Sequence, residues 1–138
     1  MGASPDGIVM DTAGRSVRLV EVKCPISAQN KTVEQACTDI KSFYCSIDEK
    51  KPSLKFDHEY YYQVQGQMAI TGIHVCDFVV LTPKDLFVQT IHFDSEFWMD
   101  TCIPKLEHFF FYFMLPELLY PKKRFPYDYS CHKSQMYI

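Results

Sequence analysis

The sequence lacks several features that would assign it to a common class of protein. Its six cysteines form no CxxC pair, its five histidines form no cluster, and it contains no internal repeat, secretory segment or apolar run long enough to span a membrane. Scattered cysteines without ligand spacing argue against a zinc centre and against a disulfide framework. We therefore expect an intracellular protein with reduced thiols and no membrane partner.

The chain also lacks an excess of positive charge. It has 14 lysines and arginines against 17 aspartates and glutamates, a net charge of −3. Non-specific DNA-binding proteins usually carry a basic surface, so this balance argues against general nucleic-acid binding but is compatible with a local basic groove. The 138 residues are 47% hydrophobic, which suits one globular unit with an adequate core.

The first 25 residues are the most informative stretch. Two apolar runs, Gly7–Met10 and Val17–Val22, are separated by a segment that holds Ala13 and Gly14. Short apolar runs around turn residues are typical of a β-hairpin, here with Gly14 at the positive φ of a type II turn. The expected pairs are Met10 with Val17, Ile8 with Leu19, and Asp6 with Glu21.

Charged residues gather at the open end of this predicted hairpin. Asp6, Glu21 and Lys23 share one face, because side chains alternate along a strand. Directly opposed Cβ atoms lie about 5 Å apart, and two carboxylates so close repel unless a cation or proton lies between them. Val20 and Val22 predict that the second strand is buried on both faces. Each acidic residue alone is more often structural, but the combination predicts a metal site.

A helix is predicted over Glu59–Gly72. The expected core stripe is Tyr61, Val64 and Met68. Gln63 and Gln67 stand four positions apart and therefore share a face, whereas Gln65 points roughly the other way. If the two glutamines are buried they need partners, either at a functional site or among backbone groups.

The remaining segments give weaker signals. Val75–Leu81 and Leu86–Phe93 predict two strands, and we expect Asp77 at a strand edge or strand end rather than as a metal ligand. Thr32 and Gln35 form a capping box that predicts a short helix.

Two polar segments interrupt this pattern. The charged turn Asp48–Lys51 is the best candidate for a flexible loop. The chain divides into a core, residues 1–119, and a polar, partly basic tail, residues 120–138. The basic run Lys122–Arg124 is either a phosphate-binding or localisation element or, by default, part of a disordered tail.

Three motifs together resemble a known family. The motifs are Ser4-Pro5-Asp6-Gly7, Val20-Glu21-Val22-Lys23-Cys24-Pro25, and Tyr61-Tyr62-Gln63-Val64-Gln65-Gly66-Gln67. In this order they resemble the YqaJ-type viral recombinase domain, the group of PD-(D/E)xK nucleases that includes phage lambda exonuclease. The likeness runs from Gly2 to about Leu119 and implies a restriction-endonuclease-like α/β fold, a mixed β-sheet flanked by helices.

The resemblance also implies a chemistry. Members are DNA nucleases that use Mg²⁺, for which Mn²⁺ is expected to substitute. The implied site residues are Asp6, Glu21, Lys23 and Gln63 for catalysis, Asp6, Glu21 and the Val22 carbonyl for the metal, and Ser4 and Gln67 for the substrate. Related helices have the form Tyr-x-x-Gln-x-x-x-Tyr. Tyr60 and Gln63 match it, whereas Gln67 stands where the second aromatic residue would be.

By the same likeness, the substrate is linear double-stranded DNA, trimmed from its 5′ end during recombination. A homotrimer and a single-strand-annealing partner protein are expected on the same ground. Two alternatives stay open: an inactive descendant that binds DNA or protein, and an endonuclease or resolvase on the same core. Because members carry an acidic helical segment upstream, we expect this chain to be N-terminally truncated and, alone, weakly active or inactive on DNA.

Overall fold

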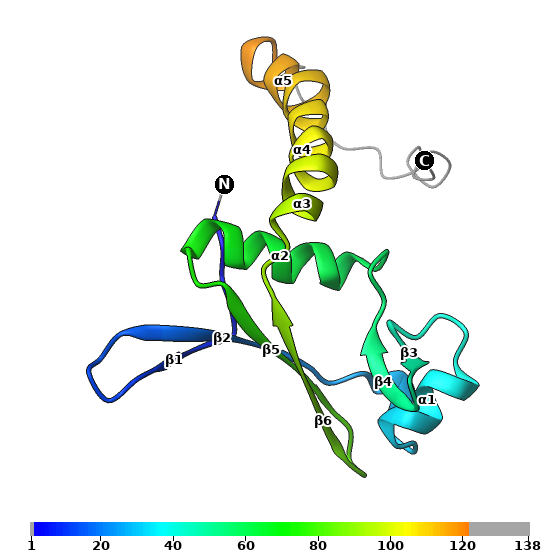
Figure 1. The fold of residues 1–138 in the computed structure, drawn as a ribbon. Helices are drawn as coiled ribbons and strands as arrows, with labels where there is room; N and C mark the ends of the chain where they lie inside the picture. Colours follow the sequence, from blue (N-terminus) through cyan, green and yellow to red (C-terminus); the bar gives the residue numbers. More distant parts are fainter. Residues whose placement is uncertain (1, 122–138) are drawn as a thin grey trace. The chain divides into compact units, whose positions relative to one another are not determined.

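A computed structural model describes residues 2–121 (Figure 1). The chain divides into two compact units, Met1–Ile103 and Pro104–Ile138. The predicted basic run Lys122–Arg124 lies outside the described residues. The strands are β1 (Gly7–Met10), β2 (Ser16–Lys23), β3 (Cys45–Asp48), β4 (Lys51–Leu54), β5 (Val75–Leu81) and β6 (Leu86–His92). The α-helices are α1 (Val33–Asp39), α2 (Glu59–Thr71), α3 (Ser95–Phe97), α4 (Ile103–Phe109) and α5 (Leu115–Leu119). A 3₁₀ turn η1 (Ile26–Ala28) and two π-helical turns, η2 (Trp98–Cys102) and η3 (Phe110–Met114), complete the elements.

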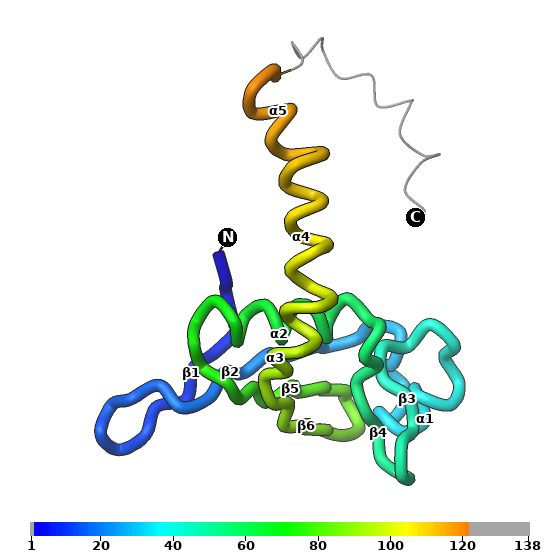
Figure 2. The backbone as a smooth tube through the Cα atoms, turned by 45° about the horizontal axis from the view of Figure 1, so that its top comes forward, coloured from blue at the N-terminus to red at the C-terminus, as the bar shows by residue number. Residues whose placement is uncertain are grey.

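The first unit is built on a mixed four-stranded sheet, which confirms the predicted mixed α/β class. The strand order is β1-β2-β5-β6, with β2 and β5 parallel and the outer pairs antiparallel. Helix α2 runs across one face of this sheet (Figures 1 and 2). Both views place the β1–β2 turn at one end of the sheet and α1 with the β3–β4 hairpin at the other.

The core lies between α2 and the sheet. Its helical side is the predicted stripe of Tyr61, Val64 and Met68, all buried. Helix α2 starts at the N-cap His58, whose Nδ1 accepts the Tyr60 N–H, and it ends at Gly72 in the left-handed region at φ 72°. The sheet contributes the fully buried side chains Leu19, Cys76, Phe78 and Val80.

The β1–β2 hairpin follows the predicted register only at its open end. Ile8 lies opposite Leu19, as predicted, but Met10 lies opposite Ser16 rather than Val17. A β-bulge after Val9 shifts the pairing by one residue. The register therefore holds where it matters for the charged residues and fails next to the turn.

The turn itself explains the shift. The Gly14 N–H donates to the Asp11 carbonyl at 3.0 Å, and the Asp11 N–H donates to the Arg15 carbonyl at 2.9 Å. Gly14 has φ 77°, so the predicted positive φ is confirmed. These bonds define the three-residue hairpin loop in which a turn is followed by a left-handed residue. The predicted two-residue loop is wrong.

Strand β2 is buried on one face only, so the prediction of two buried faces is wrong. Leu19 and Glu21 are buried toward α2, whereas on the other face Val20 is half-buried and Val22 is 37% exposed. Further exposed apolar side chains of the sheet are Ile8, Val9, Met10, Val17, Leu81, Leu86 and Val88.

The segment around residue 50, predicted as a flexible loop, is the tight turn of an antiparallel hairpin. Strands β3 and β4 pair from Cys45 with Leu54 to Asp48 with Lys51. Glu49 and Lys50 form the turn with positive φ values of 44° and 67°. No sequence pattern indicates these strands, because Pro52 stands within β4 and neither turn residue is glycine or asparagine.

Strands β5 and β6 confirm the two strands predicted after the helix, but the expected place of Asp77 is wrong. Because β5 lies between β2 and β6, Asp77 is neither at an edge nor at a strand end. Its carboxylate lies 2.7 Å from Arg18 Nη1 and accepts the Thr90 hydroxyl at 2.8 Å. Asp77 thus forms a cross-strand ion pair and is not available as a ligand.

In the second unit, α4, η3 and α5 follow one another through an aromatic-rich segment. None of the described side chains in these elements is buried, and Phe109, Phe111 and Phe113 are each more than half exposed. The Phe109 and Phe113 rings stack with their centroids 5.8 Å apart. Of the helices in the described range, none has the length and apolar character needed to cross a membrane.

Candidate active site

Asp6 lies immediately before β1, where the hairpin register brings it beside β2. Its Oδ2 accepts the Val22 backbone N–H at 2.8 Å. This bond places the exposed Asp6 carboxylate next to the peptide that joins Glu21 to Val22. The predicted proximity of Asp6 and Glu21 is thus a consequence of hairpin pairing, which continues from Gly7 opposite Val20.

Glu21 is buried to 98% and is held by three donors. Its Oε1 accepts Lys23 Nζ at 2.6 Å and Gln63 Nε2 at 2.7 Å, and its Oε2 accepts Gln67 Nε2 at 3.0 Å. A carboxylate removed from water needs such compensation to remain charged. The two glutamines stand on the face of α2 that covers β2, so the predicted four-residue spacing is what directs both amides to one carboxylate.

Lys23 connects Glu21 with the helix. Its Nζ also lies 3.2 Å from Gln63 Oε1 and 4.2 Å from the centre of the Tyr60 ring. The Gln63 amide therefore binds Glu21 through its nitrogen and Lys23 through its oxygen. A cation over an aromatic face is further stabilised by the ring. The ammonium is fixed in direction, with an ion pair on one side and an aromatic face on another.

Gln67 lies behind Glu21 rather than at the surface. It is 5% exposed, and its Nε2 also approaches the Ser4 carbonyl at 3.4 Å. Its Oε1 is buried and has no hydrogen-bond partner among the described residues. Ser4, predicted to contact substrate, is exposed beside Asp6. The position of Gln67 suits support of Glu21 better than direct contact with a substrate.

Gln65 has a structural role: its side chain bonds backbone groups, which was the alternative considered for Gln63 and Gln67. It is fully buried on another side of α2, where its Nε2 donates to the His92 carbonyl at 3.0 Å and its Oε1 accepts the Asp94 N–H at 2.8 Å. The predicted division of the three glutamines between two sides of the helix is confirmed.

The donor set fits a hard divalent cation with open positions. Glu21 Oε2 accepts one hydrogen bond in the structure and Asp6 Oδ2 accepts one, so each carboxylate keeps lone pairs for a cation. Mg²⁺ is usually bound by one or two carboxylates, with waters and phosphate oxygens completing its shell. Residues 2–121 contain no group of three or more acidic, histidine or cysteine side chains arranged for a metal. Asp6 and Glu21 are therefore the two carboxylates of this site that could hold such an ion.

A thiol lies near Glu21 but is not reactive. Burial, with a further contribution from the Glu21 charge, raises the pKa of Cys76 to about 12. The thiolate is the nucleophilic form, so Cys76 is inert at neutral pH. The polar groups that surround Glu21 are instead the Lys23 ammonium and the amides of Gln63 and Gln67.

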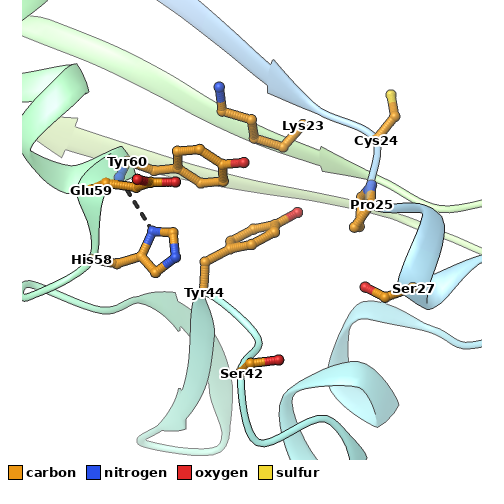
Figure 3. A pocket seen from close by; sticks show the side chains of 9 residues that line it. All are labelled: Lys23, Cys24, Pro25, Ser27, Ser42, Tyr44, His58, Glu59 and Tyr60. Carbon is orange, nitrogen blue, oxygen red and sulfur yellow. Dashed lines mark hydrogen bonds between the residues drawn. The ribbon is translucent and has the colours of Figure 1, made fainter. Parts of the chain in front are cut away.

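Sequence reasoning missed one component. A pocket of about 340 Å³ adjoins the site and is lined by Lys23 together with Tyr44, His58 and Tyr60 (Figure 3). Tyr44 and His58 come from loops and from a helix cap, which have no periodic pattern that would mark them. Only Tyr60 carried a signal, through its place in the predicted helix motif.

Comparisons with known proteins found one matching family and two similar solved structures. Residues 1–74 match a family model described as the YqaJ-like viral recombinase domain. Two solved structures of an alkaline exonuclease (LHK-Exo) from Laribacter hongkongensis, one of them in complex with dAMP, are 32% identical to the chain, with a TM-score of 0.46. The match covers 77% of this chain but only 43% of the exonuclease. No curated protein matches.

Proposed function

Because the chain belongs to the YqaJ-like viral recombinase domain family, we propose that it forms the core of a metal-dependent nuclease that hydrolyses DNA phosphodiester bonds. The observation that carries the proposal is Glu21, a buried carboxylate with Asp6 beside it and Lys23 bound to it at 2.6 Å. A buried carboxylate surrounded by a lysine and two amides is poorly explained by stability alone, because a buried ion pair often stabilises no more than apolar packing.

The residues have distinct roles in this proposal. Asp6, Glu21 and the Val22 carbonyl would hold Mg²⁺, or Mn²⁺ in its place. The ion supplies charge neutralisation on the phosphate and lowers the pKa of a bound water. Asp6 is the accessible ligand and Glu21 the fixed one, because only Glu21 is held by three side chains.

Lys23 and Gln63 act beside the ligands. The Lys23 ammonium would orient the attacking water, favour loss of its proton through the positive charge, and offset the charge that develops on the phosphate oxygens. The Gln63 oxygen, 3.2 Å from Lys23 Nζ, would help to keep this cation in place beside a bound metal. Gln67 keeps the second Glu21 oxygen in register.

The finer assignments rest on the family. We propose linear double-stranded DNA as the substrate, trimmed from the 5′ end during recombination, with Ser4 contacting a terminal phosphate. A homotrimer, a single-strand-annealing partner and an intracellular location complete the proposal. The described chain spans less than half the length of the alkaline exonuclease that it resembles, so these properties concern the whole protein.

Digestion of matched DNA substrates tests the proposal. The protein is incubated in Mg²⁺ with linear and with closed circular double-stranded DNA, and parallel samples contain EDTA. An exonuclease consumes only the linear form, and EDTA stops it. Cleavage of both forms would instead indicate an endonuclease or resolvase. Retention of both forms together with DNA binding would indicate an inactive descendant, and the proposal would be wrong.

A further inference from the structure

The pocket beside Lys23 has features of a binding site. Its walls come from four segments: the end of β2, the η1 turn, the loop before β3 and the first turn of α2. Its volume of about 340 Å³ falls in the usual range for small-molecule sites, about 300–1,000 Å³. Lys23 belongs to both the pocket and the Glu21 site, so a ligand in the pocket would adjoin any phosphate bound there.

Tyr44 presents an unpartnered polar group to this pocket. The residue is 8% exposed, and its buried hydroxyl has no hydrogen-bond partner within residues 2–121. Figure 3 shows its ring at the centre of the lining side chains, with the hydroxyl directed toward the side that Cys24 and Pro25 line. Burial raises the pKa of Tyr44 strongly, so the phenol stays protonated and offers both a donor and an acceptor. Buried polar atoms are rarely left unpaired, and an unpaired one indicates an absent partner.

The other lining groups suit a flat, polar-edged ligand. The rings of Tyr44, His58 and Tyr60 have centroids between 4.8 and 5.8 Å apart and form an aromatic wall. His58 Nδ1 accepts the Tyr60 N–H at 3.2 Å (Figure 3), so the proton of the neutral ring is on Nε2. The exposed hydroxyls of Ser27 and Ser42 line the same pocket.

We propose that this pocket binds the base of the nucleotide whose phosphate lies at the Asp6–Glu21–Lys23 site. The inference rests on the proposed function and extends it to a base subsite. Nucleobases have π faces that pack on aromatic side chains and edges that carry hydrogen-bond donors and acceptors. The Tyr44 hydroxyl would pair with the base edge, and Lys23 would lie at the phosphate end. A sugar phosphate without a base would leave the Tyr44 hydroxyl unpaired.

Equilibrium binding to the 138-residue chain tests the subsite without any need for cleavage. Calorimetry in Mg²⁺ compares thymidine 5′-monophosphate with 2-deoxyribose 5-phosphate, which lacks the base. We expect the nucleotide to bind at least about tenfold more tightly. Tyr44→Phe removes only the hydroxyl and should weaken nucleotide binding about three- to tenfold, the usual effect of one hydrogen bond. It should leave binding of the sugar phosphate unchanged.

Two further variants make the result decisive. Tyr62→Phe removes a hydroxyl from α2, outside the pocket lining, and should change neither affinity. Ser42→Phe, at an exposed loop position, fills the pocket mouth and should abolish the preference for the nucleotide without lowering the melting temperature. Because the Tyr44 hydroxyl is unpaired when buried, Tyr44→Phe should keep or raise the melting temperature.

The outcomes separate the subsite from the nuclease activity. Equal affinity for the nucleotide and the sugar phosphate would overturn the inference. It would also be overturned if the Tyr44→Phe and Ser42→Phe variants each bound the nucleotide like the unaltered chain. Such a result together with Mg²⁺-dependent DNA cleavage would leave the proposed function intact. Base-dependent binding that is lost in both variants would support the subsite, even if the nuclease proposal failed in the digestion experiment.

Discussion

Two carboxylates on neighbouring strands of one sheet, Glu21 and Asp77, each pair with a cation but differ in their other hydrogen-bond donors. Glu21 on β2 and Asp77 on β5 point to opposite faces, because Asp77 lies opposite Val20 and Glu21 lies opposite Phe78. Each contacts a basic side chain within 2.7 Å. Asp77 pairs with the Arg18 guanidinium and the Thr90 hydroxyl, whereas two uncharged amides from α2 hold Glu21.

We interpret this difference as one between a structural carboxylate, Asp77, and the proposed metal ligand, Glu21. The cation of Asp77 is fixed between strands and is partly exposed, with 39% of the Arg18 side chain accessible. The cation of Glu21, Lys23, belongs to the same strand, and Gln63 and Gln67 from α2 also donate to the carboxylate. In our proposal these two amides would keep Glu21 in place when a metal binds. Burial and an ion pair are common to both, so neither identifies the site. The two neutral donors to Glu21, Gln63 and Gln67, distinguish the proposed site from the Asp77 ion pair.

The largest expected difference follows from removing each charge in turn. Glu21→Gln should abolish Mg²⁺ or Mn²⁺ binding in calorimetry and reduce DNA cleavage below detection, because it removes a hard anionic ligand. Asp6→Asn should do the same. The matched variant Asp77→Asn should bind metal and cleave DNA like the unaltered chain. Metal affinity that is unchanged in both Glu21→Gln and Asp6→Asn would contradict the site.

The two cations should differ next. Lys23→Ala should lower cleavage by at least about a hundredfold, the usual effect of losing one acid–base group or one transition-state contact. It should keep or slightly strengthen metal binding, because an ammonium cannot be a ligand and competes with the metal for Glu21. Arg18→Ala serves as the control and should leave the cleavage rate unchanged. If Lys23→Ala cleaved DNA at the native rate, the catalytic role assigned to Lys23 would be wrong.

The buried glutamines give a smaller contrast. Gln67→Leu removes a donor from Glu21 and should weaken metal binding about tenfold or more, the usual effect of losing a residue that orients a ligand. Gln65→Leu removes bonds to the His92 carbonyl and the Asp94 N–H. It should lower the melting temperature but leave metal affinity as it is. If the two variants affected metal binding equally, Gln67 would be only a structural residue like Gln65.

The smallest effect concerns the structural pair. A double-mutant cycle with Arg18→Ala and Asp77→Ala should give a coupling free energy of about 1 kcal/mol, because both side chains are partly exposed. Urea denaturation of the four proteins measures it. A coupling free energy near zero would mean that Asp77 is held mainly by the Thr90 hydroxyl. Asp77 and Glu21 would then differ only in whether a hydroxyl or amides donate to the carboxylate.

The open end of the hairpin, which carries Asp6, Glu21 and Lys23, could be predicted from sequence because side chains alternate between the two faces of a strand. Ile8 opposite Leu19 is correct, and Asp6 consequently reaches β2. The pairing of Met10 was wrong because a bulge is a backbone event, and the residues around Gly14 suit both a two-residue and a three-residue loop. The error stayed local, since the bulge lies between the turn and the charged residues.

Other features depend on contacts that no local pattern contains. Burial of β2 on both faces was inferred from Val20 and Val22, but valines are also common on exposed strand faces. The pocket residues Tyr44 and His58 are brought together only when the β3–β4 hairpin folds next to α2, and that hairpin has Pro52 in a strand. Sequence therefore predicted the carboxylates and the helix amides but not the wall beside them.

The parallel pairing of β2 with β5 bears on how the chain leaves the ribosome. Arg18 meets Asp77 across 59 positions, so the β1–β2 hairpin is synthesised well before the strand that covers its second edge. An unpaired edge of this kind recruits other chains, and inward-pointing charges are one of the devices by which proteins avoid this. Glu21 and Lys23 occupy that exposed edge during synthesis. We therefore expect that replacing both by apolar residues would lower the soluble yield, because the nascent hairpin would lose the charges on its unpaired strand.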